Sequence, residues 1–378
     1  MRLSVYSIQK LKYKGGSLYN LSQTIMKNLD LKPSGKPLRE LNTGGKGLSV
    51  VVLDGFGYNI AVRSGSIEDN GDYLTSVFPS ITTTVLTTLM SGQLPGEHGI
   101  LGESVYLKKF GSIVNLFSYS PIYSEEKDSL KAIEPMKSTF ETFDIISNAT
   151  QNGKRCAVIT PNSSANTELS SVTTGESGDR FYFRGIWDAL EIYRSVLKQN
   201  YDYVYLYIPF IDKMAHIYGP FGDPTLRAAT DISKSVREIA NENSSRYVTV
   251  ITADHGHIEA GQGVLLSDSE EFERTTSMPP FGSSRSLFLS GHHELIEVLT
   301  TETPDLKIFD NSDPHIRMLL GSTDVFKKTT FNYIAVPEVN QFYFHQKTAF
   351  YYATIDFKGR HGGLSKDEML VPYIKVGE

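Results

Sequence analysis

Three aspartates next to predicted strand ends, and three histidines, could together bind metal ions. Asp54, Asp212 and Asp254 each follow an apolar segment within a few residues, and ligands of open α/β sheets bind beyond the carboxyl ends of the strands. The candidate metal ligands are Asp54, Asp212, His216, Asp254, His255 and His361. Carboxylate oxygen mixed with imidazole nitrogen suits zinc, with manganese or iron as alternatives. Carboxylates alone would have indicated magnesium or calcium.

The spacing of these residues indicates that neighbours in sequence share an ion. Asp212 and His216 are four residues apart and lie on one face if their segment is helical. Asp254 and His255 are adjacent at a predicted strand end, and Gly256 permits a sharp turn directly after them. We therefore expect each pair to contribute to a metal site.

Hydroxyl side chains before the apolar run 85–90 offer a nucleophile. Ser80, Thr82, Thr83 and Thr84 lie where a helix is expected to begin, and the unpaired amides of a helix N-terminus favour phosphate. Coordination to a divalent cation lowers the pKa of a hydroxyl group and makes it nucleophilic. The residue types alone do not select among the four, and each could instead cap the helix.

Alternating strands and helices are expected to position these side chains. The apolar run 48–53, bounded by glycine, predicts a strand buried on both faces. Further strands are expected at 155–160, 203–208 and 247–252, and helices at 18–29, 187–199 and 224–239. One helical face is predicted to carry Trp187, Leu190, Tyr193, Val196 and Leu197. The alternation predicts an α/β fold with a mainly parallel sheet covered on both sides.

The alternation stops after about residue 260. Short strands are expected at 286–289 and 306–309, and one short helix at 294–300. We interpret 262–345 as a small inserted cap subdomain, and 1–261 with 346–378 as the catalytic core. The run 349–355 is expected to re-enter the main sheet and to lead to His361.

Composition excludes several classes of protein. The formal net charge of −6 argues against a nucleic-acid binder, and 40% hydrophobic with 21% charged residues is ordinary for a globular protein. The single cysteine, Cys156, lies in an apolar run and is expected to be a buried core residue. The apolar stretches of a secretory signal or a membrane span are not seen. We therefore expect a cytoplasmic protein with no membrane partner.

Five motifs, in this order, resemble the type I phosphodiesterase and nucleotide pyrophosphatase family of the alkaline phosphatase superfamily. They are VVLDGFG, FPSITTTVLTTLMSGQLPGEHGILG, DKMAHIYGP, TADHG and HGG. The resemblance covers about residues 48–365, and the motifs are specific as an ordered set. It implies a three-layer αβα sandwich of the alkaline phosphatase type with a small inserted cap. It also implies hydrolysis of a small phosphate ester or nucleotide.

The resemblance further implies roles for individual residues. The family's threonine nucleophile corresponds to Thr82. One metal ion would be bound by Asp212, His216 and His361, and the second by Asp54, Asp254, His255 and Thr82. Both ions would be divalent, zinc first and manganese second. Two such ions, about 4 Å apart, can stabilise both the attacking and the leaving oxygen of an in-line displacement.

One position departs from the family pattern, and several histidines lie outside the predicted ligand set. Relatives carry a phosphate-binding asparagine where this sequence has Glu103, whose charge would repel an anionic ester. His98 is expected to organise its loop by hydrogen bonding, and His257 to lie beside the metal ligands. A phosphodiesterase is the first interpretation. A phosphomonoesterase, a phosphonate hydrolase and a catalytically silent binder of metal or nucleotide are the alternatives.

Overall fold

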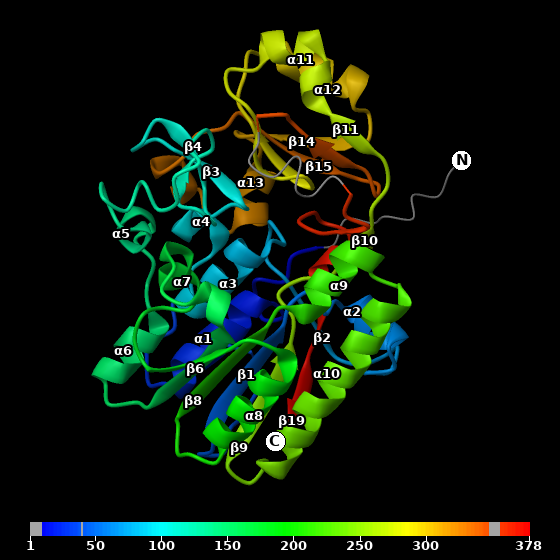
Figure 1. Cartoon of the computed structure of the whole chain (residues 1–378). Coiled ribbons are helices and arrows are strands. Elements are labelled where there is room, and N and C mark those ends of the chain that lie inside the picture. Colours follow the sequence, from blue (N-terminus) through cyan, green and yellow to red (C-terminus); the bar gives the residue numbers. More distant parts are fainter. Residues whose placement is uncertain (1–9, 39–40, 348–355) are drawn as a thin grey trace.

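A six-stranded sheet forms the centre of the larger part of the molecule. The computed structural model describes residues 10–38, 41–347 and 356–378. The central strands are β1 (Gly47–Leu53), β6 (Cys156–Pro161), β7 (Asp179–Phe183), β8 (Tyr203–Ile208), β9 (Tyr247–Thr252) and β19 (Ile374–Val376). Their order is β19-β9-β1-β8-β6-β7 (Figure 1). All neighbours are parallel except β19, which pairs antiparallel with β9 at one edge.

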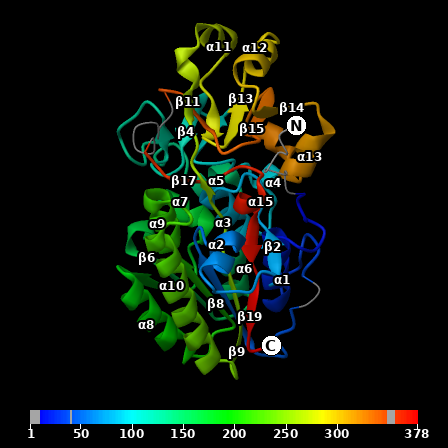
Figure 2. The ribbon, with the colours of Figure 1, turned by 90° about the vertical axis from the view of Figure 1, so that its right-hand side faces the viewer.

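Helices cover both faces of this sheet. They include α1 (Leu18–Asn28), α3 (Thr82–Ser91), α8 (Ile186–Leu197) and α10 (Asp223–Glu242). Helices α8 and α10 lie on one side, and α1 lies on the other (Figure 2). Because both faces are covered, Val50, Val51 and Val52 of β1 are completely buried. The three layers confirm the predicted α/β fold of the alkaline phosphatase type.

The predicted core elements match the observed ones within a few residues. Strands β8 and β9 have the expected bounds, and β1 begins one residue earlier than expected. The prediction for Trp187 was wrong, because this side chain is 76% exposed. In α8 the buried residues Ala189, Leu190, Tyr193 and Leu197 continue from the partly buried Ile186. The apolar stripe therefore begins at Ile186, and Trp187 lies beside it.

A second, seven-stranded sheet lies above the carboxyl ends of the central strands (Figure 1). It contains β3 (Ser104–Leu107), β4 (Ser112–Asn115), β5 (Ser120–Pro121), β12 (Phe281–Ser283), β13 (Ser286–Leu289), β14 (Leu306–Asp310) and β15 (Tyr333–Pro337). All its pairings are antiparallel, and β12 joins β3 by the pair Gly282–Ser104. The sheet thus combines strands of the predicted insertion 262–345 with strands from before it. The bounds of a cap subdomain stay a prediction.

Shorter elements complete the described part of the chain. The helices are α2 (Tyr58–Arg63), α4 (Pro95–His98), α5 (Met136–Phe140), α6 (Ile145–Gln151), α7 (Glu168–Thr173), α9 (Phe210–Tyr218), α11 (Glu270–Thr275), α12 (Leu295–Glu302), α13 (Pro314–Leu320) and α15 (Lys366–Met369). The strands are β2 (Tyr73–Thr75), β10 (Ile258–Glu259), β11 (Gly263–Leu265), β16 (Phe342–Phe344), β17 (Gly359–Arg360) and β18 (Leu370–Pro372). The strand predicted at 349–355 lies outside the described residues. No helix in the described ranges has both the length and the apolar character needed to cross a membrane.

Candidate metal centre

The carboxyl ends of two adjacent central strands bring together Asp54, Asp254 and His255. Asp54 follows β1 directly, and Asp254 lies two residues after β9, its parallel neighbour. His255 Nε2 lies 3.4 Å from Asp54 Oδ1 and 3.3 Å from Asp254 Oδ2. One ligand atom from each of the three residues falls within 4.8 Å of the others, as binding of one ion requires.

Helix α9 and the loop after β17 form a second cluster around Asp212. His216 Nε2 lies 3.2 Å from Asp212 Oδ1, as the four-residue spacing on a helix predicts. His361 Nε2 lies 3.8 Å from the same oxygen. The other ring nitrogens bond to backbone carbonyls, His216 Nδ1 to Gly359 at 2.8 Å and His361 Nδ1 to Ser80 at 3.0 Å. These outer contacts orient both Nε2 atoms toward Asp212.

His257 also belongs to this second cluster. Its Nε2 lies 2.9 Å from Asp212 Oδ1, and its side chain is buried. Ligand atoms of Asp212, His255, His257 and His361 lie within 4.8 Å of one another. His257 therefore lies beside Asp212, within a group of side chains that could hold an ion.

Of the four candidate hydroxyl side chains, that of Thr82 faces the clusters. Its Oγ1 lies 3.1 Å from His255 Nε2, and Thr82 is the first residue of α3. Ser80 Oγ donates to the carbonyl of Gly363, and Thr83 Oγ1 donates to that of Gly102. Thr84 is completely buried. The fold thus distinguishes residues that sequence reasoning left equivalent.

A glycine allows the first cluster to approach the second. Gly55 has a φ of 69°, and its amide donates to Asp254 Oδ1 at 3.1 Å. A Cβ atom at this position would lie 2.8 Å from Asp212 Cα. Only glycine fits between the two clusters without displacing one of them.

The buried carboxyls repel one another and require compensating positive charge. Burial raises the pKa of Asp54 well above its ordinary value, and the charges of Asp254 and Asp212 raise it further. Burial, with the charge of Asp212, raises the pKa of Asp254 to about 7 although the Gly55 amide opposes this. Asp54 Oδ1 and Asp254 Oδ2 are buried without a hydrogen-bond partner among the described residues. Divalent cations fit this donor set in chemistry and in charge.

One further contact at the centre was missed by sequence reasoning. The hydroxyl of Tyr207 donates to Asp54 Oδ2. Tyr207 lies in β8, next to β1, and pairs with Val52 two positions before Asp54. Tyr203, Tyr205 and Tyr207 alternate along β8 and so lie on one face of the strand. This pattern is typical of core aromatics and gives no sign of the polar role of Tyr207. His98, by contrast, organises its loop as predicted: its ring bonds to Thr88 Oγ1 and to the amide of Ile100, each at 3.0 Å.

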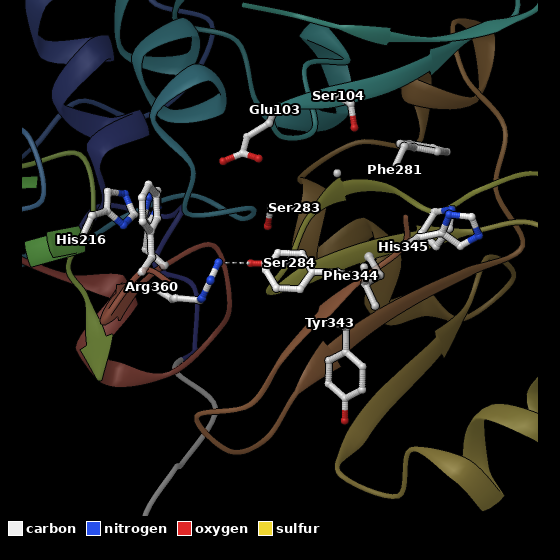
Figure 3. Close-up of a pocket in the computed structure, with 15 residues that line it drawn as sticks. Glu103, Ser104, His216, Phe281, Ser283, Ser284, Tyr343, Phe344, His345 and Arg360 are labelled. Carbon is white, nitrogen blue, oxygen red and sulfur yellow. Dashed lines mark hydrogen bonds between the residues drawn. The ribbon is translucent and has the colours of Figure 1, made fainter. Parts of the chain in front are cut away.

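A pocket extends from the metal ligands to the second sheet (Figure 3). Its lining includes His216, His361 and Arg360 on the side of the core, and Glu103, Phe281, Ser283, Ser284, Tyr343, Phe344 and His345 on the side of the second sheet. Glu103 and Arg360 lie on opposite sides of the space, and Arg360 reaches toward Ser284. Burial raises the pKa of Glu103 to about 7, although His216 and Arg360 oppose this. A substrate held at the metal ligands would therefore meet Glu103.

Comparison with known proteins agrees with this arrangement. The model of the type I phosphodiesterase/nucleotide pyrophosphatase family matches residues 67–278, more than half of the chain. Murine ectonucleotide pyrophosphatase/phosphodiesterase 5 has a similar structure, with a TM-score of 0.64, 15% identity and 88% of each chain covered. Its human counterpart gives 0.62, 17% identity and the same coverage. A further murine structure is that of an inactive threonine-to-alanine variant in complex with AMP. No curated protein matches the sequence.

Proposed function

Because the chain belongs to the type I phosphodiesterase/nucleotide pyrophosphatase family and is a phosphoric ester hydrolase, we propose that it cleaves phosphodiesters or nucleotide pyrophosphates with Thr82 as nucleophile. The observation that carries the proposal is the contact of this hydroxyl with His255, a residue common to both groups of candidate ligands. Thr82 Oγ1 is 3.1 Å from His255 Nε2, which itself contacts Asp54 and Asp254.

Two divalent cations, zinc or manganese, are proposed as cofactors. Asp212, His216 and His361 would hold one, and Asp54, Asp254, His255 and Thr82 the other. His257 is assigned to the orientation of Asp212, to which it bonds at 2.9 Å. When bound, these ions supply Lewis acidity at the phosphoryl oxygens and lower the pKa of a coordinated hydroxyl.

The residues at the start of α3 perform the proposed displacement. Thr82 Oγ1 loses its proton and forms a bond to phosphorus, while the bond from phosphorus to the leaving oxygen breaks and that oxygen takes up a proton. Water then attacks the threonine-phosphoryl intermediate and releases Thr82. The amides at the N-terminus of α3 have no partner within the helix and favour the negative charge of the phosphoryl group.

A nucleotide is the substrate class that we propose first. The structurally similar murine protein binds AMP when its threonine is replaced by alanine, and that variant is inactive. In this chain the pocket beside the ligands has aromatic walls, including Phe281 and Phe344, against which a base or another planar group can pack. Glu103 distinguishes this pocket chemically, because it places a carboxyl group beside the anionic ester.

Paired chromogenic substrates test the proposal. Steady-state hydrolysis of a phosphate diester and the matching monoester is measured after chelation and after addition of zinc, manganese or magnesium. We expect diester cleavage that vanishes with the chelator and returns with zinc or manganese. Preference for the monoester would replace the assignment by a phosphomonoesterase. Two bound ions per chain without turnover of either substrate would favour a silent binder.

A further inference from the structure

A buried ion pair connects the second sheet to the loop that carries His361. Arg285 lies in the turn between β12 and β13, and Glu368 lies in α15. Arg285 Nε and Nη2 donate to the two carboxylate oxygens of Glu368 at 3.0 and 2.9 Å. Both side chains are 0% exposed. This two-bond geometry fixes the relative orientation of both groups, unlike a single flexible contact.

The remaining hydrogen-bonding groups of the pair bind backbone on both sides. Arg285 Nη1 donates to the carbonyls of Val339 and Gln341. Glu368 accepts the amide of Gly363 at 2.8 Å, and the hydroxyl of Ser365 at 2.7 Å. Burial would raise the pKa of Glu368, but the Arg285 guanidinium and these donors hold it below its ordinary value. The Glu368 carboxyl is therefore held in its ionised form.

The loop bound by Glu368 leaves no space for a side chain at Gly362, directly after His361. Gly362 has a φ of 115°, and a Cβ atom there would lie 2.6 Å from Ser283 Oγ and 2.7 Å from Ile81 Cδ1. Ser80 contacts the loop twice, because its hydroxyl donates to the Gly363 carbonyl and its carbonyl pairs with His361 Nδ1. The loop is thus confined by the β12–β13 turn, by the segment before Thr82 and by Glu368.

The β12–β13 hairpin also forms one wall of the pocket. Phe281, Gly282, Ser283, Ser284 and Leu287 of this hairpin line it, and Ser283 and Ser284 face the space beside Arg360 (Figure 3). Arg285 follows these residues in the same turn and is directed away from the pocket, to Glu368. One ion pair therefore links the pocket wall to the loop of a metal ligand.

We propose that Arg285 and Glu368 are positioning residues that fix the His361 loop relative to the pocket wall. They thereby set the metal affinity of the site formed by Asp212, His216 and His361. This inference rests on the proposed function. Burial of two charges is costly, and apolar residues of similar size often replace such pairs without loss of stability. Their backbone bonds to the His361 loop supply what apolar residues cannot, which is a fixed ligand orientation.

Titration of the metal-free full chain with Co²⁺ tests the inference, because its visible absorption depends on ligand geometry. Glu368→Gln keeps the size of the side chain but removes its charge and one acceptor, and Arg285→Lys keeps the charge but loses the paired bonds. Both should weaken Co²⁺ binding at one of two sites by roughly 10–100-fold and should change the absorption spectrum. Replacing both residues by leucine should give a higher thermal stability than either single variant, but the Co²⁺ affinity should stay as low as theirs.

Asp144→Asn is the matched control. Asp144 is buried, forms an ion pair with the partly exposed Lys137 at 2.8 Å and caps α6, away from the pocket. This variant should lose stability but keep wild-type Co²⁺ affinity. Unchanged affinity and spectrum in folded Glu368→Gln, or in Arg285→Lys if the first variant does not fold, would overturn the inference. Wild type that binds no Co²⁺, or a His361→Ala variant that still binds two ions, would instead refute the proposed function.

Discussion

Replacement of Asp254 by asparagine should change the pH dependence of stability of the metal-free protein. Asp254 Oδ1 accepts the amides of Gly55 and His255 at 3.1 and 3.0 Å, and an asparagine oxygen can accept both. Oδ2 has no hydrogen-bond partner among the described residues and lies 3.3 Å from His255 Nε2. Asp254→Asn therefore removes a buried charge and keeps both hydrogen bonds.

The size of the effect follows from the raised pKa of Asp254. Burial, followed by repulsion from Asp212, raises this pKa from 3.8 to about 7. A raised folded-state pKa means that the folded protein disfavours the ionised carboxyl. The contribution of Asp254 to the free energy of unfolding is therefore fully present below pH 3.8 and is lost as pH rises to about 7. The loss amounts to about 4 kcal/mol at most, by the free-energy equivalent of a pKa difference.

Because the histidines of the centre also titrate, wild type must be compared with Asp254→Asn. Burial lowers the pKa of His255 to about 3 and that of His257 to about 4. Their contributions to stability rise with pH below the ordinary pKa of histidine, so they oppose the trend of Asp254 in wild type. They are present in both proteins, so the difference between wild type and Asp254→Asn reports the aspartate together with its coupling to Asp54, whose pKa the charge of Asp254 raises.

Urea unfolding with a chelator present measures this difference at about pH 4 and about pH 8. The free energy of unfolding of Asp254→Asn, relative to wild type, should rise by up to about 4 kcal/mol between the two values. Saturating zinc should reverse the order, because it stabilises wild type and binds the variant weakly. A stability difference that does not vary with pH would refute the account of the buried carboxyls.

Three further predictions concern the pocket, the loop of His98 and the cofactors. Glu103→Gln should lower KM for a diester at about pH 8. In wild type we expect KM to rise as Glu103 ionises near pH 7, and the variant should not show this rise. Equal KM values of the two proteins in steady-state assays would contradict this. His98→Ala should reduce the free energy of unfolding by about 2 kcal/mol, because Thr88 Oγ1 and the Ile100 amide lose a partner, and denaturant unfolding checks the value. Zinc at a hundredfold excess over its Kd should stabilise the protein by about 2.7 kcal/mol per site; a melting temperature that does not depend on zinc would exclude metal binding.

The central sheet and the clustering of the candidate ligands could be predicted because their signals are local. Apolar runs such as 48–53 end directly at Asp54, and the parallel sheet brings such ends together. The pair Asp212 and His216 is encoded by helical spacing alone. His98 was predicted correctly in the same way, since its partners Thr88 and Ile100 lie only 10 and 2 residues away in sequence.

The remaining features depend on contacts between distant segments, which leave no local pattern. Thr82 differs from Thr83 and Thr84 only in what the fold places beside its hydroxyl. The pairing of β12 with β3 joins two segments far apart in sequence, so the composite second sheet had no signal in either. Arg285 lies among serines and Glu368 follows Lys366 and Asp367, so neither sequence context marks its residue as buried, and only the tertiary structure shows that the two bind each other.

Turnover of a chromogenic phosphodiester by Thr82→Val and Thr84→Val, with bound metal counted per chain, tests the central claim most directly. Both changes replace a hydroxyl by a methyl group, but only the Thr82 hydroxyl faces the ligand clusters. With two ions bound to each protein, Thr82→Val should lose at least roughly a thousandfold in kcat, and Thr84→Val should stay within a few-fold of wild type. A metal-loaded Thr82→Val enzyme that keeps a tenth or more of the wild-type kcat would contradict the assignment of Thr82 as nucleophile.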